Sequence, residues 1–133
     1  MNKIYVVGIG PGNYEEMTLR AANALNASDV IIGYTVYVDL VKEHFAGKEF
    51  LTTPMKKEVD RCVMAFEEAK KGKVVSMICS GDAGVYGMAG LMYQVGADYP
   101  EGTDHETEVY LIDGTVGRGT APSGASTGEF EAI

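Results

Sequence analysis

The sequence predicts an α/β fold, with a mostly parallel sheet, helices on both faces and an irregular C-terminal tail. Short runs of β-branched and aromatic residues alternate with segments of helical period, and the connections between them are only a few residues long. Two of the runs lead directly into glycine-rich loops. A chain of 133 residues, 46% of them hydrophobic, is long enough to bury one sizeable core.

Five segments are predicted strands because they are short, apolar and bounded by glycine or other turn residues. The first run stops at Gly8 and the second at Gly33, whereas Asp113 and Gly114 form a turn signal after the last. The predicted strands are residues 3–7, 30–32, 50–52, 74–79 and 109–112.

Four segments have the apolar spacing of helices. Thr18 is a predicted N-cap, followed by a helix whose apolar positions begin at Leu19, and Gly72 is a natural end for the third helix. The predicted helices are residues 19–25, 34–44, 56–71 and 85–95. In the third, the side chains predicted to face the core are Val59, Val63, Phe66 and Ala69.

Composition excludes two kinds of partner. The net charge is −8, with 19 acidic against 11 basic residues, whereas nucleic-acid binding depends on clustered lysine and arginine. The apolar runs are too short to cross a membrane and the start lacks the long apolar region of a signal peptide, so we expect a cytoplasmic protein. Acidic residues are concentrated in residues 98–133, which marks this stretch as different in origin or role.

Side chains that could carry catalysis or hold a metal are sparse. Cys62 and Cys79 fit neither a disulfide framework nor a zinc site, and we expect two reduced, buried or half-buried thiols. His44 and His105 have no partner at a suggestive spacing and are predicted to lie on the surface. The sequence therefore predicts no catalytic side chain and no metal site. Any catalysis would depend on holding reactants in the right geometry, as in methyl transfer from a sulfonium donor.

Two glycine-rich loops are the candidate binding sites. Residues 8–12 read Gly-Ile-Gly-Pro-Gly, which has its third glycine too early for a dinucleotide fingerprint and a proline that removes a backbone donor. A nicotinamide or nucleotide domain is therefore disfavoured. Residues 80–87 carry Asp82, which could bind a ligand or cap the helix that follows. Because parallel strands end on one rim, both loops are expected at the same edge of the sheet.

Several motifs in a fixed order resemble the N-terminal domain of the tetrapyrrole methylases. The Gly-Ile-Gly-Pro-Gly loop at 8–12 resembles the first signature of that family, and Val-Ile-Ile-Gly-Tyr at 30–34 resembles its next segment. The run Gly-Asp-Ala-Gly-Val-Tyr-Gly-Met-Ala-Gly at 81–90 departs from the general Gly-Gly-Asp-Pro pattern. It is similar to one branch, the precorrin-3B C17-methyltransferases of cobalamin biosynthesis. The resemblance covers residues 1 to about 105.

The resemblance implies a reaction and a role for each matched position. The reaction is methylation of C17 of a precorrin or cobalt-precorrin by S-adenosylmethionine, accompanying ring contraction. The positions implied to contact the methyl donor are Gly81, Asp82, Val85, Tyr86 and Pro11. The positions implied to line the floor where donor and tetrapyrrole meet are Gly8, Gly10 and Gly12.

The family pattern stops before the chain ends. Residues from about 106 to 133 are similar to the N-terminal region of enolase, for example in Ser-Gly-Ala-Ser-Thr-Gly at 123–128. We therefore expect a methylase-like domain at residues 1–112 and an enolase-like tail at 113–133. Members of the family continue into a second α/β domain, so this chain alone is expected to bind the donor weakly and turn over little. The alternative is an inactive domain that forms homo-oligomers through an exposed apolar face.

Overall fold

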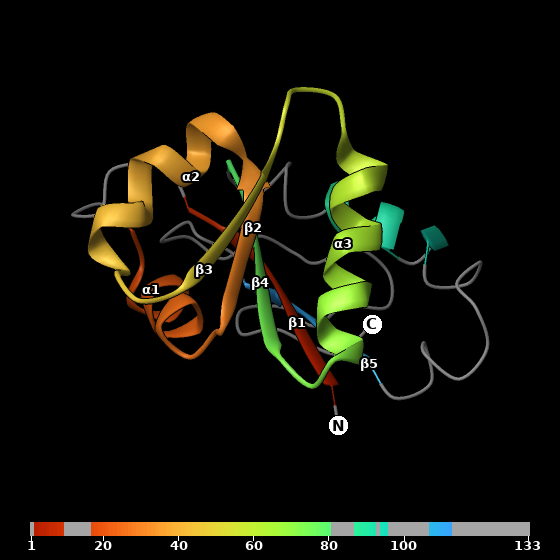
Figure 1. The fold of residues 1–133 in the computed structure, drawn as a ribbon, viewed down its shortest axis with the longest axis horizontal. Helices are drawn as coiled ribbons and strands as arrows, with labels where there is room; N and C mark the ends of the chain where they lie inside the picture. The colour runs from red at the N-terminus through yellow and green to blue at the C-terminus, as the bar shows by residue number, and fades with distance from the viewer. Residues whose placement is uncertain (1, 10–16, 81–86, 93, 96–106, 113–133) are drawn as a thin grey trace.

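The computed structural model describes residues 2–9, 17–80, 87–92, 94, 95 and 107–112. Its five strands form one all-parallel sheet in the order β3-β2-β4-β1-β5 (Figure 1). The strands are β1 (Asn2–Gly8), β2 (Val30–Tyr34), β3 (Glu49–Thr53), β4 (Val74–Cys79) and β5 (Thr107–Ile112). The helices are α1 (Leu19–Asn26), α2 (Thr35–Val41), the 3-10 helix η2 (Lys42–His44) and α3 (Glu58–Lys70). Residues 87–92, 94 and 95 are also helical.

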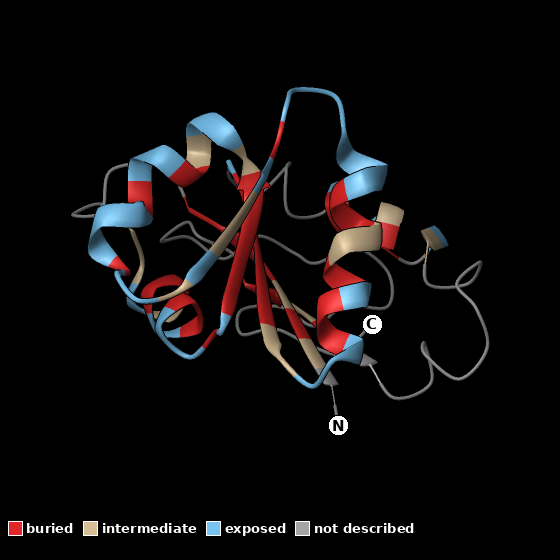
Figure 2. Ribbon diagram, viewed as in Figure 1, coloured by how far each residue is buried: buried red, intermediate tan, exposed pale blue. Residues whose placement is uncertain are grey.

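Helices cover both faces of the sheet, and the buried side chains lie between the layers (Figures 1 and 2). Because side chains alternate along a strand, each strand contributes to two core clusters. Val6 and Met77 pack in one cluster with α3 and the helical residues 88–92. Val7 and Ile78 pack in the other with α1 and α2. The predicted fold class, a parallel sheet between two helical layers, is confirmed.

The helix ends follow local signals, but the apolar faces begin later than predicted. Thr18 caps α1 through its Oγ1, which accepts a hydrogen bond of 3.1 Å from the Ala21 amide, and Gly72 ends α3 with a φ of +91°. Leu19 and Val59 lie in the first turns of α1 and α3 and are 76% and 52% exposed, so their predicted burial is wrong. The buried apolar side chains of α3 are Cys62, Ala65, Phe66 and Ala69.

The prediction that the second strand stops at Gly33 is wrong, because Gly33 lies inside β2. The strand continues to Tyr34, and both residues pair with β3. A Cβ built on Gly33 would lie 2.5 Å from Cγ1 of Ile78 and 3.3 Å from Cγ2 of Val38. Close packing of β2 against β4 and α2 therefore favours glycine at this position. Glycine inside a strand often marks such a close approach.

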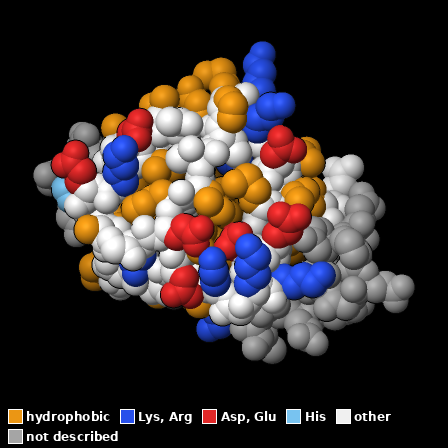
Figure 3. Space-filling view, in the orientation of Figure 1, with side chains coloured by type: hydrophobic (Ala, Val, Ile, Leu, Met, Phe, Trp, Pro, Cys, Tyr) orange, Lys and Arg blue, Asp and Glu red, His pale blue; other side chains and the backbone are white. Residues whose placement is uncertain are grey.

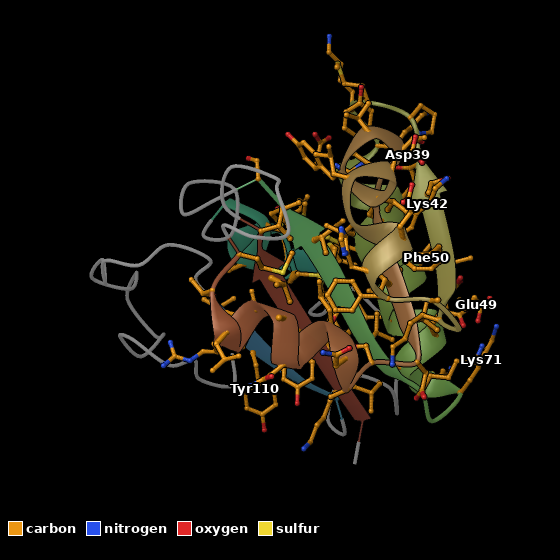
Figure 4. All side chains as sticks on the ribbon, turned by 90° about the vertical axis from the view of Figure 1, so that its left-hand side faces the viewer. Asp39, Lys42, Glu49, Phe50, Lys71 and Tyr110 are labelled. Carbon is orange, nitrogen blue, oxygen red and sulfur yellow. The ribbon has the colours of Figure 1, made fainter. Side chains whose placement is uncertain are left out.

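The amino ends of β3 and β4 are tied to α3 by charged side chains. Lys73 contacts Glu49 and Glu68 at 2.9 Å each, and Lys71 contacts Glu68 at 3.0 Å. The Asp29 carboxylate accepts a 2.9 Å hydrogen bond from the amide of Val74. Figure 3 shows side chains of both signs gathered in this lower part of the molecule, and Figure 4 places Glu49 and Lys71 at the same end of the sheet. This edge of the sheet is thus occupied by structural contacts.

Candidate functional site

The carboxyl ends of β1 and β4 lie side by side at the opposite edge. Gly8 is opposite Cys79, and the amide of Ile9 donates a hydrogen bond of 2.9 Å to the Cys79 carbonyl. From β1 the chain passes to α1 on one face, and from β4 it passes to the helical residues 87–92 on the other. Neighbouring strands whose following connections run to opposite faces of the sheet form a topological switch point. Ligands of α/β proteins bind at such points.

Of the eight residues implied to bind the reactants, the structure describes one. Gly8 is buried at the end of β1, where the first loop begins. The structure places the starts of the two glycine-rich loops, at Gly8 and Ser80, next to each other. Both loops therefore leave the sheet at the same edge, as expected. The other implied residues lie outside the described ranges: Gly10, Pro11, Gly12, Gly81, Asp82, Val85 and Tyr86.

A pocket of about 270 Å³ opens beside the stem of the second loop. Its walls come from the carboxyl ends of β2 and β4, from α2, from the first turn of α3 and from the helical residues 87–91. Ser80 and Gly87, which flank residues 81–86, both line it. A ligand held by that loop would therefore lie next to the side chains of this pocket.

Two tyrosines form one wall of the pocket. Tyr34 ends β2 and Tyr37 follows in α2, and their rings meet edge to face with centroids 5.4 Å apart and planes at 87°. The hydroxyl of Thr35 donates a 3.2 Å hydrogen bond to the Thr53 carbonyl, which ties the start of α2 to the end of β3. The pair thus presents aromatic surface and hydroxyl groups from a fixed backbone.

Arg61 is a pocket residue that the sequence patterns missed. It lies in the first turn of α3 and is only 6% exposed. Its Nη1 donates to Oγ1 of Thr53 at 2.6 Å, and its Nη2 lies 3.7 Å from a carboxylate oxygen of Glu58. One sequence signal could have indicated that Arg61 is enclosed. It directly precedes Cys62, a residue predicted to be buried or half-buried, on a helix predicted to pack against the sheet.

The two thiols are neutral at ordinary pH. Burial raises the pKa of Cys62 and of Cys79 to about 12, and the nearby Arg61 guanidinium offsets only part of this effect. Sγ of Cys62 lies 3.6 Å from Sδ of Met88 in the core. Because the thiolate is the reactive form, neither cysteine is suited to nucleophilic or metal chemistry. The prediction of reduced, buried thiols is confirmed.

Other chemistry is sparse in the part of the chain that the structure describes. His44 is exposed, as predicted, and His105 lies outside the described residues. The described residues contain no group of three or more histidine, cysteine or acidic side chains that could hold a metal ion. Within the same ranges, no helix is both long and apolar enough to cross a membrane.

The chain thus folds as a parallel α/β domain with a switch point at the carboxyl ends of β1 and β4 and a pocket beside β2 and β4, the edge at which domains of this class hold small molecules. Residues 3–106 match the family described as Tetrapyrrole (Corrin/Porphyrin) Methylases. This match covers most of the chain, and the chain belongs to that family.

Curated relatives and a solved structure agree with the family. A probable cobalt-factor III C(17)-methyltransferase of Salmonella typhimurium is 46% identical over 90 residues, which are 68% of this chain and 37% of the relative. The cobalamin biosynthesis protein CbiHC of Archaeoglobus fulgidus is 40% identical over 134 residues, covering 98% of this chain and 29% of that protein. The crystal structure of the methyltransferase CobJ has a TM-score of 0.75 and 30% identity, covering 88% of this chain and 48% of CobJ. This chain therefore spans less than half of each.

The expected join to an enolase-like tail is not supported. The alignment with CbiHC covers 98% of the chain, so it includes most of residues 106–133, and it gives no sign of a second origin. Within that stretch, residues 107–112 form β5, which pairs with β1 in the sheet and contributes Val109 and Leu111 to the core.

Proposed function

We propose that this chain is the N-terminal part of an S-adenosylmethionine-dependent C-methyltransferase that acts at C17 of a corrin precursor, precorrin-3B or its cobalt-containing counterpart. The observation that carries the proposal is the pairing of Gly8 with Cys79, because it starts both glycine-rich loops from neighbouring strands at the switch point. The family and the C17-methyltransferase relatives support the same reaction.

In this proposal the second loop holds the methyl donor through Gly81, Asp82, Val85 and Tyr86, with Pro11 from the first loop. The glycines of the first loop, Gly8, Gly10 and Gly12, line the floor beneath the macrocycle. The pocket beside the second loop has room for the methionyl end of such a donor, because apolar side chains such as Met88 and Leu91 suit its aliphatic chain and sulfur.

The chemistry of the proposal is mainly positioning. S-adenosylmethionine supplies an activated methyl group when bound, so the chain has to orient the two reactants and exclude water between them. The buried, neutral thiols and the sparse histidines of the described residues agree with a site that uses no nucleophile of its own.

The proposed domain comprises residues 1–112, with residues 113–133 leading out of it. Since the chain spans less than half of its relatives, we expect it to contribute one side of the binding cleft. One side buries only part of a ligand, so donor binding by this chain is expected to be weak. Association of two copies through the uncovered side stays a prediction, and light scattering after size-exclusion chromatography tests it.

Calorimetric titration of the chain with S-adenosylhomocysteine tests the proposed function. We expect measurable binding that Asp82→Ala weakens at least tenfold, because a lost hydrogen bond to a charged group is worth about 1.5–3 kcal/mol. Asp39→Ala is the matched control, since Asp39 is an exposed carboxylate paired with Lys42 on the outer side of α2 (Figure 4). Equal affinity of the wild type and Asp82→Ala would remove Asp82 from the site.

A further inference from the structure

Among the residues that the structure describes, the buried guanidinium of Arg61 has no buried anion as its partner. Its residue is 6% exposed, and taking a charge out of water is costly unless the charge is paired and hydrogen-bonded. Within the described ranges its ion-pair partner is Glu58, whose side chain is 49% exposed and whose carboxylate oxygen lies 3.7 Å from Nη2. That distance is too long for a hydrogen bond, so the pair is loose.

The hydrogen bonds of Arg61 also leave part of its donor fork open. Nη1 donates to the Thr53 hydroxyl at 2.6 Å and approaches the Pro54 carbonyl at 3.5 Å. Among the described residues, no hydrogen bond from Nη2 or Nε of Arg61 reaches an acceptor. A guanidinium has five N–H donors in a rigid plane, matched to a carboxylate that binds two of them. The open donors belong to a residue that lines the pocket.

We propose that Arg61 binds a carboxylate of one of the reactants in this pocket. The proposal rests on the proposed function, because that function brings carboxylate-bearing molecules to this edge of the sheet. The amino-acid end of the methyl donor carries one carboxylate, and the acidic side chains of a corrin precursor carry several. The ligand group is in either case a carboxylate on a short aliphatic chain.

The shape of the pocket agrees with this ligand. A volume of about 270 Å³ is below the range of about 300–1,000 Å³ of pockets for whole drug-sized ligands, and a macrocycle is larger still. It does accommodate one side chain of a macrocycle or the methionyl end of the donor. Ile78, Met88 and Leu91 provide apolar walls for the aliphatic chain, and Arg61 provides the charge. The half-exposed Glu58 is able to turn toward water when a carboxylate displaces it.

Nuclear magnetic resonance of the arginine side chain tests the proposal without either reactant. The probe is sodium propionate, titrated into the wild-type 133-residue chain, with the uncharged propionamide as the matched control at equal ionic strength. We expect the Nε–Hε signal of Arg61 to move saturably with propionate and to stay in place with propionamide. In Glu58→Gln, which removes the competing carboxylate, we expect propionate to bind several-fold more tightly. An Arg61 signal that ignores propionate overturns the proposal.

Two further titrations distinguish the source of the carboxylate. If it belongs to the donor, we expect Arg61→Gln to weaken the binding of S-adenosylhomocysteine at least tenfold. The affinity for 5′-methylthioadenosine, which lacks the amino-acid end, should stay unchanged. If it belongs to the macrocycle, we expect Arg61→Gln to weaken the binding of the polycarboxylate uroporphyrin and to leave the affinity for S-adenosylhomocysteine unchanged. Arg61→Lys keeps the positive charge but lacks the two parallel N–H donors of a guanidinium. We therefore expect it to restore part of the affinity for whichever ligand Arg61→Gln weakens. A variant that binds both ligands as the wild type does contradicts the inference.

The failure of this inference differs from the failure of the proposed function. If S-adenosylhomocysteine binds in a manner that depends on Asp82 while Arg61 ignores every carboxylate, the proposed function stands and the inference falls. If propionate moves the Arg61 signal but S-adenosylhomocysteine does not bind, the carboxylate site stands and the proposed donor site falls.

Discussion

Replacing Gly33 by alanine tests the packing between β2 and β4. The added Cβ would lie 2.5 Å from Cγ1 of Ile78 and 3.1 Å from its Cδ1, so that side chain or the strand has to move. Ile78 is 2% exposed and packs in the core cluster with α1 and α2, and it also lines the pocket. Overpacking of this kind costs about 1–3 kcal/mol. We therefore expect Gly33→Ala to lower the free energy of unfolding by that amount.

Urea unfolding followed by circular dichroism measures the effect, and a double-mutant cycle identifies its cause. Ile78→Ala removes the two nearest atoms that the new methyl group meets and leaves Cγ2 of Val38 at 3.3 Å, so Gly33→Ala should cost much less in that background. Gly87→Ala is the control, because a Cβ there meets no atom of the described residues within 4 Å. A loss below about 0.5 kcal/mol, or equal losses in both backgrounds, would refute the reasoning.

Two other predictions concern titratable groups. Hydrogen bonds from Lys73 and Lys71 hold the pKa of Glu68 below its ordinary value of 4.5, so its contribution to stability is present above pH 4.5 and disappears as the pH falls through the folded-state pKa. Urea midpoints should therefore fall less steeply below pH 4.5 in Glu68→Gln than in the exposed control Glu67→Gln, and parallel profiles would contradict this. Cys62 and Cys79, with pKa values of about 12, should resist Ellman's reagent at pH 8 in the folded protein and react fully in urea. Rapid labelling of the native chain would show that a thiol is accessible.

The strands and most helix ends were predictable because local signals determine them. A short apolar β-branched run bounded by turn residues predicts a buried strand, and Thr18 caps α1 through atoms only three residues away. The same local signals failed at Gly33. Glycine marks both chain breaks and close approaches, and only the neighbouring strand decides between them.

The site was only partly predictable. The common edge of the two loops follows from parallel topology, and Gly8 and Cys79 end neighbouring strands there. The pocket and Arg61 were missed because helical period separates apolar from polar positions but does not show which polar side chain is enclosed by other elements. Arg61 is enclosed because β3 ends at Thr53 and α3 begins at Glu58, which returns the helix over the strand end.

The position of β1 in the sheet has a consequence for how the chain folds as it is made. β1 is the first strand described in this chain, yet its partners β4 and β5 begin at Val74 and Thr107. β2 and β3, by contrast, follow each other along the chain with only α2 and η2 between them, so they are able to pair earlier. β1 therefore has no partner among the described strands until β4 has been made, and its other edge is paired only once β5 has been made. Such a chain depends on late, long-range pairing, and the period of waiting is when chaperone binding would protect it most.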